Sequence, residues 1–272
     1  MDEAEGLIAL CVRALVAQMS EAPGFELHMT RTCALALTDE PLADFNVLTL
    51  GPDPDAEGFL RRAVARARAR GRPLVATMSP HVAPALAPVA AGLGLTPVGT
   101  APLMVLRTGS SDSGTRYLSP TLASATRATG IGILSPAAPV RVVRALGPEL
   151  VRIAGDLVAA AFDAPRDAVA RCIDPCVSAA AGVETHIAWA GDQPVSAVTV
   201  TPSGDTAGIT LMATPPPLQR RGFGRALLTQ VIDDYRRRGV ERFYLGATAA
   251  GRPLYASLGF ETVAELSAWL LA

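Results

Sequence analysis

The chain contains no lysine. All 24 of its basic side chains are arginine, and with 25 acidic side chains the formal net charge is −1. The absence of lysine excludes a P-loop, whose G-x-x-x-x-G-K-[ST] motif needs a lysine to reach the phosphates. A near-zero net charge also gives no basic surface for nucleic acid or an anionic membrane. We therefore expect neither a nucleic-acid partner nor a membrane partner.

Cysteine and long apolar runs are also scarce. Four cysteines in 272 residues do not make a disulfide scaffold. Cys172 and Cys176 have no histidine near them in the sequence, so they are expected to be buried thiols and no metal is expected. No apolar run reaches the roughly 18 residues that span a bilayer. The start, MDEAEGL, is acidic where a secretory signal is basic, so a cytoplasmic location is expected.

Half of the residues are hydrophobic, enough for the cores of one large or two modest domains. The most informative stretch is residues 211–228, LMATPPPLQRRGFGRALL. The pattern predicts a strand over residues 207–213, a proline-rich turn, and then an amphipathic helix that Gly239 ends. The apolar face of this helix repeats at helical spacing and comprises Leu227, Leu228, Val231, Ile232 and Tyr235.

A glycine-containing turn between a strand and a helix predicts an anion site. Unpaired main-chain N–H groups and the positive end of the helix dipole meet there. Gly222 and Gly224 are expected to let a phosphate approach the main chain, because a Cβ would stand in its place. Nearby arginines add positive charge. A dinucleotide fingerprint does not fit, because it needs three glycines where this stretch has two.

The order Q-x-x-G-x-G after a strand, here Gln219 to Gly224, resembles the pyrophosphate-binding loop of the GNAT superfamily of N-acetyltransferases. The likeness over residues 219–240 is greatest to the ribosomal-protein N-terminal acetyltransferases. A second segment, PLYASLGF at residues 253–260, resembles the L-Y-x-x-L-G-F segment of the same family. Two matches in the right order and spacing support the resemblance.

The resemblance implies a function and a set of site residues. It implies acetyl-CoA, or another acyl-CoA, as co-substrate, with direct acyl transfer to an amine in a ternary complex and Tyr255 as the general acid that protonates the leaving thiolate. Main-chain N–H groups would polarise the thioester carbonyl. The implied cofactor-binding residues are Met212, Ala213, Thr214, Gln219, Arg220, Arg221, Gly222, Phe223, Gly224, Arg225 and Thr248.

An internal repeat predicts two such domains. LGLTPV at residues 93–98 aligns with LGFETV at residues 258–263, and each is followed by an apolar strand. The fold class expected is α/β (α+β), with two tandem GNAT-like domains, each a mixed, mostly antiparallel sheet flanked by helices. The predicted boundaries are residues 1–108 for a degenerate domain, 109–138 for a linker, and 139–272 for the catalytic domain.

The two copies differ where the cofactor would bind. In place of the Gln219 loop, the N-terminal copy has DPDAEG at residues 53–58. Three carboxylates would repel a pyrophosphate, and Pro54 has no N–H. Acidic residues in the first turn of a helix have a structural use, since they cap it. We therefore predict that the N-terminal copy has lost cofactor binding.

Two departures from the family pattern concern the chemistry. An asparagine that often contacts the cofactor is Thr248 here, and a strand glutamate that serves as base in some members is Phe243. A base could come from Glu184 or His186 on a predicted hairpin, through a water, or from no residue if the amine binds neutral. Tyr255 has a structural alternative, which is packing beside Phe260.

Three functions follow as hypotheses. The first is an acetyltransferase that acts on a primary amine of a small molecule or peptide. The second is an inactive acyl-CoA-binding regulatory module, and the third is a non-enzymatic interaction protein. The sequence does not identify the acceptor or the oligomeric state.

Overall fold

The computed structural model describes residues 3–108, 140–172 and 182–272. The N-terminal half contains α1 (Glu3–Met19), β1 (Glu26–Met29), β2 (Cys33–Leu37), η1 (Ala43–Phe45), β3 (Val47–Leu50), α2 (Ala56–Ala69), β4 (Leu74–Met78), α3 (Ala83–Gly92) and β5 (Thr96–Arg107). The C-terminal half contains β6 (Val140–Arg144), α4 (Pro148–Phe162), α5 (Arg166–Cys172), β7 (Glu184–Ala190), β8 (Gln193–Ser203), β9 (Thr206–Ala213), η2 (Pro216–Leu218), α7 (Phe223–Arg237), β10 (Arg242–Gly246), α8 (Arg252–Ala256) and β11 (Glu261–Leu271).

These strands form one 11-stranded sheet in the order β1-β2-β3-β4-β11-β5-β10-β9-β8-β7-β6. Among the described strands, only β3 with β4 and β9 with β10 pair in parallel. The predicted fold class is confirmed: each half is a mixed, mostly antiparallel sheet flanked by helices. The sequence pattern predicted neither β1 nor β2, and it predicted only the last part of β5.

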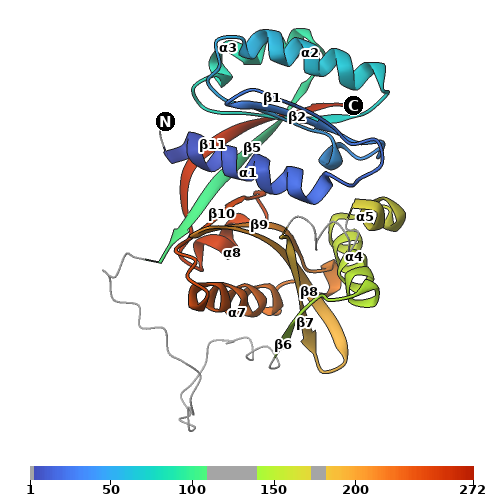
Figure 1. Ribbon diagram of the computed structural model, residues 1–272, viewed down its shortest axis with the longest axis vertical. Coiled ribbons are helices and arrows are strands. Elements are labelled where there is room, and N and C mark those ends of the chain that lie inside the picture. Colours follow the sequence, from blue (N-terminus) through green and yellow to red (C-terminus); the bar gives the residue numbers. More distant parts are fainter. Residues whose placement is uncertain (1–2, 109–139, 173–181) are drawn as a thin grey trace, which may run out of the picture.

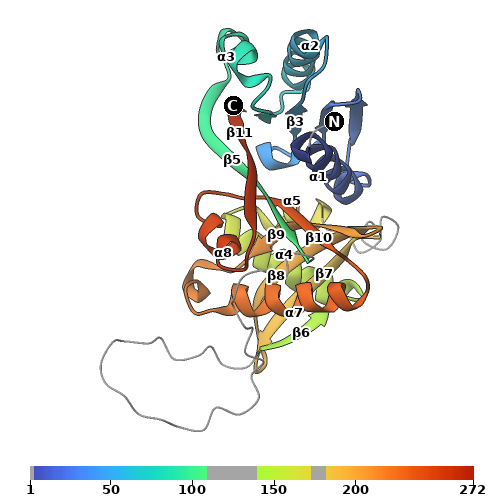
Figure 2. The same cartoon turned by 90° about the vertical axis from the view of Figure 1, so that its left-hand side faces the viewer.

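The two halves exchange their last strands. β11, at the end of the chain, pairs with β4 of the N-terminal half, and β5 pairs with β10 of the C-terminal half. β5 and β11 also pair with each other along the middle of the molecule. They run side by side between the two halves in Figure 1 and Figure 2, and the C-terminus lies among N-terminal elements. Each half therefore completes its sheet with a strand of the other.

The helices cover both faces of this sheet. Met104 and Leu106 of β5 pack with α7 and α8, while Leu103 and Val105 point to the opposite face and pack with α1. α1 belongs to the N-terminal half by sequence but lies over β5, β10 and β11. The predicted linker, residues 109–138, and Cys176 lie outside the described residues, so the domain boundaries and the thiol assignment stay predictions.

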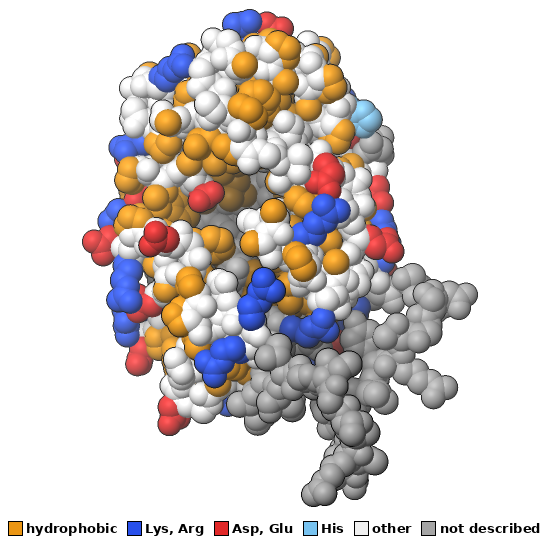
Figure 3. Space-filling view, turned by 180° about the vertical axis from the view of Figure 1, so that it is seen from behind, with side chains coloured by type: hydrophobic (Ala, Val, Ile, Leu, Met, Phe, Trp, Pro, Cys, Tyr) orange, Lys and Arg blue, Asp and Glu red, His pale blue; other side chains and the backbone are white. Residues whose placement is uncertain are grey.

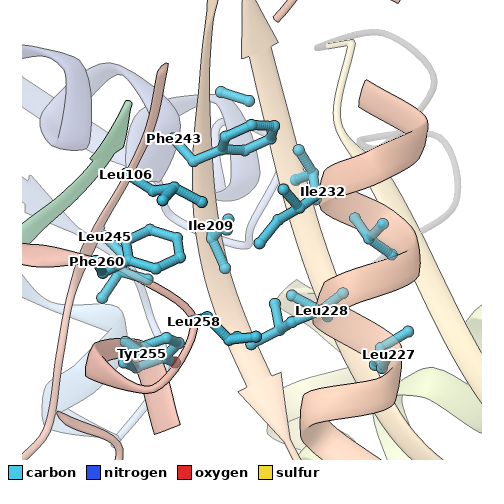
Figure 4. Packing of buried hydrophobic residues seen from close by; sticks show 14 of the residues in the cluster. Leu106, Ile209, Leu227, Leu228, Ile232, Phe243, Leu245, Tyr255, Leu258 and Phe260 are labelled. Carbon is cyan, nitrogen blue, oxygen red and sulfur yellow. The ribbon is translucent and has the colours of Figure 1, made fainter. Parts of the chain in front are cut away.

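α7 forms as the sequence predicts. Its buried face consists of Phe223, Leu227, Leu228, Val231, Ile232 and Tyr235. This face packs on Ile209 of β9 and Phe243 of β10 (Figure 4). Gly239, with φ of 91°, ends the helix in a left-handed conformation that favours glycine. The packing of α7 places its N-terminus at the end of β9.

Candidate active site

β9 and β10 diverge part of the way along their length, and we call this point the fork. They pair in parallel only from Arg242 opposite Thr206 to Tyr244 opposite Gly208. Beyond Gly208, β9 continues to Ala213 with β8 as its only neighbour in the described sheet. Its main-chain N–H and C=O groups on the β10 side therefore have no strand partner. An extended ligand can bind these groups as an additional strand would.

A β-bulge in β9 lies just beyond the fork. Ala197 pairs with Ala213 and Thr199 with Thr210, so Leu211 and Met212 together face one residue of β8. Leu211 has a φ of 47°, which costs a leucine roughly 1–2 kcal/mol. A bulge turns main-chain groups away from the regular ladder. The N–H groups at this position are therefore directed differently from those of a regular strand.

The turn from β9 into α7 exposes a series of main-chain donors. The first α7 amide with a main-chain acceptor is that of Ala226, which donates to Gly222 at 3.0 Å. Within the described residues, the N–H groups of residues 220–225 have no such acceptor, and no side chain caps the helix. Arg220 and Gly222 have φ of 61° and 84°, and left-handed residues of this kind curl successive N–H groups into an anion-binding nest. The turn therefore has the main-chain geometry of an anion-binding nest.

Three arginines surround this turn. Arg220, Arg221 and Arg225 are exposed, and none of them has an ion pair with a carboxylate in the described part of the chain. The Arg221 guanidinium lies 5.1 Å from the centre of the Phe223 ring. Cations at a helix N-terminus are unfavourable unless an anion is bound there. The molecular face that carries α8 and the start of α7 is hollowed at its middle, with basic side chains below the hollow (Figure 3).

Gly224 lies where α7 packs closely on β9. A Cβ there would lie 3.0 Å from Met212 Cε and 3.3 Å from Thr214 Oγ1, and not in open space. A side chain at Gly224 would therefore crowd β9, and the predicted role of this glycine, room for a phosphate, stays a prediction. At Gly222 the positive φ itself favours glycine.

Hydrogen bonds hold the rest of the loop in place. The Gln219 side chain donates to the Thr214 carbonyl at 3.0 Å and so closes the proline-rich turn. The Ser196 hydroxyl on β8 donates to the Ala213 carbonyl at 2.7 Å and lies 2.8 Å from Thr214 Oγ1. Ser196 is a residue that sequence reasoning missed, because nothing local marks a β8 serine as a partner of β9.

Tyr255 lies on α8 beside this site. Leu254, its neighbour on α8, is within contact distance of the position that a Gly224 Cβ would take. The Tyr255 ring is 8% exposed and packs edge-on against Phe260 at 5.8 Å (Figure 4). Its hydroxyl has no hydrogen-bond partner among the described residues, and burial raises its pKa to about 12. The phenol is thus held in its protonated form at neutral pH.

Thr248 has a local structural use. Its Oγ1 accepts the Gly251 N–H at 3.0 Å, and its carbonyl accepts the Arg252 N–H at 2.9 Å. These bonds start α8, the helix that carries Tyr255. Thr248 is exposed, so it can be near a bound cofactor, but its hydroxyl oxygen already accepts a hydrogen bond.

Glu184 and His186 are far from the loop. They lie beneath the last turn of α7, where Glu184 accepts hydrogen bonds from Arg238 at 2.8 Å and from the Tyr235 hydroxyl at 2.7 Å. His186 Nε2 is 3.3 Å from the same hydroxyl. Because α7 is about 22 Å long at 1.5 Å per residue, its first and last turns are well separated. Both residues therefore have structural partners at the far end of α7, and the hypothesis that either is the catalytic base stays a prediction.

This buried network predicts how stability depends on pH. Burial lowers the pKa of His186 to about 4, against the opposing effect of Glu184 and Asp234, while Arg144 and Arg238 lower it further. Below pH 6.5, which is the ordinary pKa of histidine, the unfolded chain binds a proton that folded His186 does not bind. The free energy of unfolding therefore falls by about 3 kcal/mol between pH 6.5 and 4.

The Glu184 carboxyl group affects stability over a lower pH range. Hydrogen bonds from Arg238 lower the pKa of Glu184 to about 2, so the stability that this carboxylate provides is lost as pH falls from 4.5 towards 2. Thermal denaturation across pH 8 to 3 measures both effects. A His186→Gln variant should lose the slope between pH 6.5 and 4, and an unchanged slope would contradict the assignment.

The N-terminal half has no fork. β3 and β4 pair to their ends, from Val47 opposite Val75 to Leu50 opposite Met78, and the Ser79 N–H continues the ladder to Leu50. The Asp53 carboxylate accepts the Asp55 N–H at 2.9 Å, and the Asp53 carbonyl accepts that of Ala56. Two N–H groups at the start of α2 thus have acceptors within the chain, whereas those of residues 220–225 have no main-chain acceptor among the described residues. These differences are consistent with the predicted loss of cofactor binding in the N-terminal copy, which stays a prediction.

Known proteins are similar to parts of this chain in sequence and to nearly all of it in fold. A model described as the acetyltransferase (GNAT) family matches residues 156–260. The [ribosomal protein bS18]-alanine N-acetyltransferase of Escherichia coli (strain K12) is 44% identical over 59 residues, which are 21% of this chain and 40% of that protein. The chain thus aligns with less than half the length of this curated relative.

Two solved structures cover nearly the whole chain. A GCN5-related N-acetyltransferase from Kribbella flavida has a TM-score of 0.67 at 17% identity, over 99% of this chain and 95% of that one. A tandem GNAT protein from the clavulanic acid biosynthesis pathway has a TM-score of 0.58 at 15% identity, over 98% and 93%. These likenesses show the fold of both halves. The match over residues 156–260 shows that the C-terminal half of this chain is similar to the GNAT acetyltransferase family.

Proposed function

We propose that the protein is an N-acetyltransferase that transfers an acetyl or other acyl group from acyl-CoA to a primary amine of a small molecule or peptide. The observation that carries this proposal is the row of free N–H groups at residues 220–225, beside a fork that leaves the edge of β9 unpaired. The proposed catalytic domain is residues 139–272, with residues 1–108 as the degenerate copy and 109–138 as the linker.

The loop and β9 would hold the co-substrate. When bound, acyl-CoA supplies a thioester whose acyl carbon an amine can attack. The amides of residues 220–225 and the adjacent arginines bind the diphosphate, and the main chain at Met212, Ala213 and Thr214 pairs with the extended pantetheine arm. Amides at the bulge of Leu211 and Met212 donate to the thioester carbonyl oxygen, where negative charge develops.

The chemistry then needs one proton donor. The neutral amine forms a bond to the acyl carbon, the carbon–sulfur bond breaks, and the Tyr255 hydroxyl gives its proton to the departing sulfur. The phenol is protonated at neutral pH, as a proton donor must be. We assign no side chain as general base, so the acceptor binds as the free amine and its proton passes to water.

Two experiments test the proposal. Isothermal titration with acetyl-CoA should show one site per chain, and a thiol-release assay should detect turnover with at least one member of an amine panel. The panel should include peptides with an N-terminal alanine, because the Escherichia coli relative is named for that acceptor. Binding without turnover on any amine would support the inactive regulatory module instead. No binding would leave the non-enzymatic interaction protein.

A further inference from the structure

Helix α1, from the degenerate half, contacts both strands of the fork at the point where they separate. On one side, the Gln18 amide donates to Thr210 Oγ1 at 2.5 Å and lies 3.5 Å from Thr201 Oγ1. On the other side, the Tyr244 hydroxyl donates to the Leu10 carbonyl at 3.3 Å. Thr210 follows the last paired residue of β9 by two positions, and Tyr244 is the last residue of β10 that pairs with β9.

The two contacts of α1 lie a fixed distance apart on one helix, and each is closely packed. Leu10 and Gln18 are eight residues apart on α1, or about 12 Å along the helix. Gln18 is only 8% exposed, and a buried amide is retained where its hydrogen bonds are made. Gly208 leaves room for the other contact, because a Cβ there would lie 2.9 Å from the Tyr244 hydroxyl. One rigid helix thus holds β9 through a side chain and β10 through its main chain.

We propose that α1 fixes the width of the fork, with Gln18 as a positioning residue for the acyl-binding strand. Thr210 comes directly before the bulge at Leu211, so the Gln18 bond sets where the next amides point. This role would explain why a half that lacks a fork of its own contributes to the site. The inference rests on the proposed acyl transfer, and it requires no contact between Gln18 and either substrate.

The test compares Gln18→Leu with a control in the same helix. Gln18→Leu keeps the volume and removes both hydrogen bonds, while Ile8→Val removes one methylene from a buried α1 side chain that packs on β5, β10 and β11. We expect Gln18→Leu to lower kcat by about 10- to 100-fold with little change in acetyl-CoA affinity, because small displacements of reacting groups have effects of this size. Ile8→Val should leave kcat unchanged while lowering the melting temperature.

Hydrogen exchange provides a readout that does not depend on turnover. Amides of residues 209–214 should exchange faster in Gln18→Leu, and also in a second variant, Tyr244→Phe, than in Ile8→Val. Equal exchange in all three variants would overturn the inference, as would equal kcat. If the unmodified protein releases no thiol with any amine, the proposed function fails by itself, and the exchange rates alone then decide whether α1 positions the fork.

Discussion

Replacing Gly222 with glutamate is expected to abolish acetyl-CoA binding. Gly222 has a φ of 84°, and the free N–H groups of the loop surround it. A carboxylate there would repel the diphosphate, and a Cβ would distort the turn that aims the donors. Losing two charge-assisted hydrogen bonds of about 1.5 kcal/mol each already weakens Kd by about 100-fold. Isothermal titration measures the loss.

Gly239 offers a matched control at the other end of the same helix. It too has a positive φ, 91°, and a Cβ there would meet no atom within 4 Å. Gly239→Glu therefore adds the same charge and similar backbone strain to α7, and it should lower the melting temperature while Kd for acetyl-CoA stays unchanged. If the two variants bind acetyl-CoA with equal affinity, the loop is not part of the binding site.

The C-terminal half was predictable because its signals are local. The strand, the loop and α7 are consecutive in the chain, and their glycines and apolar spacing depend on near neighbours. The acidic character of the corresponding N-terminal loop was also predictable, because Asp53 and Asp55 belong to the same short segment. The sequence indicated the order of elements and the positions of the loop residues, but not the way in which strands of the two halves pair.

The remaining features depend on contacts between distant residues. β5 and β11 are adjacent in the sheet although more than half of the chain separates them, and Gln18 meets Thr210 across 192 positions. β1 and β2 are short, and β2 is buried along its whole length, so neither shows the alternation that marks a half-buried strand. The bulge at Leu211 was equally hidden, because a leucine gives no sign of a positive φ.

Such contacts also determine the environment of Glu184 and His186, the two residues that the sequence offered as a possible catalytic base. Glu184 and His186 looked suitable as isolated residue types on a strand. Their chemistry is decided by Arg238 and Tyr235 at the end of α7, which convert them into a buried structural network. The same reasoning applies to Tyr255, whose neighbours are compatible with either a structural or a chemical role.

Replacing Tyr255 with phenylalanine separates these two roles. The hydroxyl has no hydrogen-bond partner among the described residues, and the ring contact with Phe260 survives the change, so stability should hold. If the phenol protonates the leaving sulfur, kcat should fall by about 100-fold, the lower range for a lost general acid. Kd for acetyl-CoA, measured by titration, should change little, because the loop and β9 provide the binding.

Tyr235 is the matched control, since it is a buried tyrosine of the same hydrophobic cluster. Its hydroxyl donates to Glu184 at the far end of α7, so Tyr235→Phe should lower the melting temperature and leave kcat unchanged. A loss of kcat in Tyr255→Phe and a loss of stability in Tyr235→Phe would distinguish a role in proton transfer from a role in packing. If Tyr255→Phe keeps the full rate, the residue is only a packing partner of Phe260, and the thiolate must leave unaided or take its proton from water.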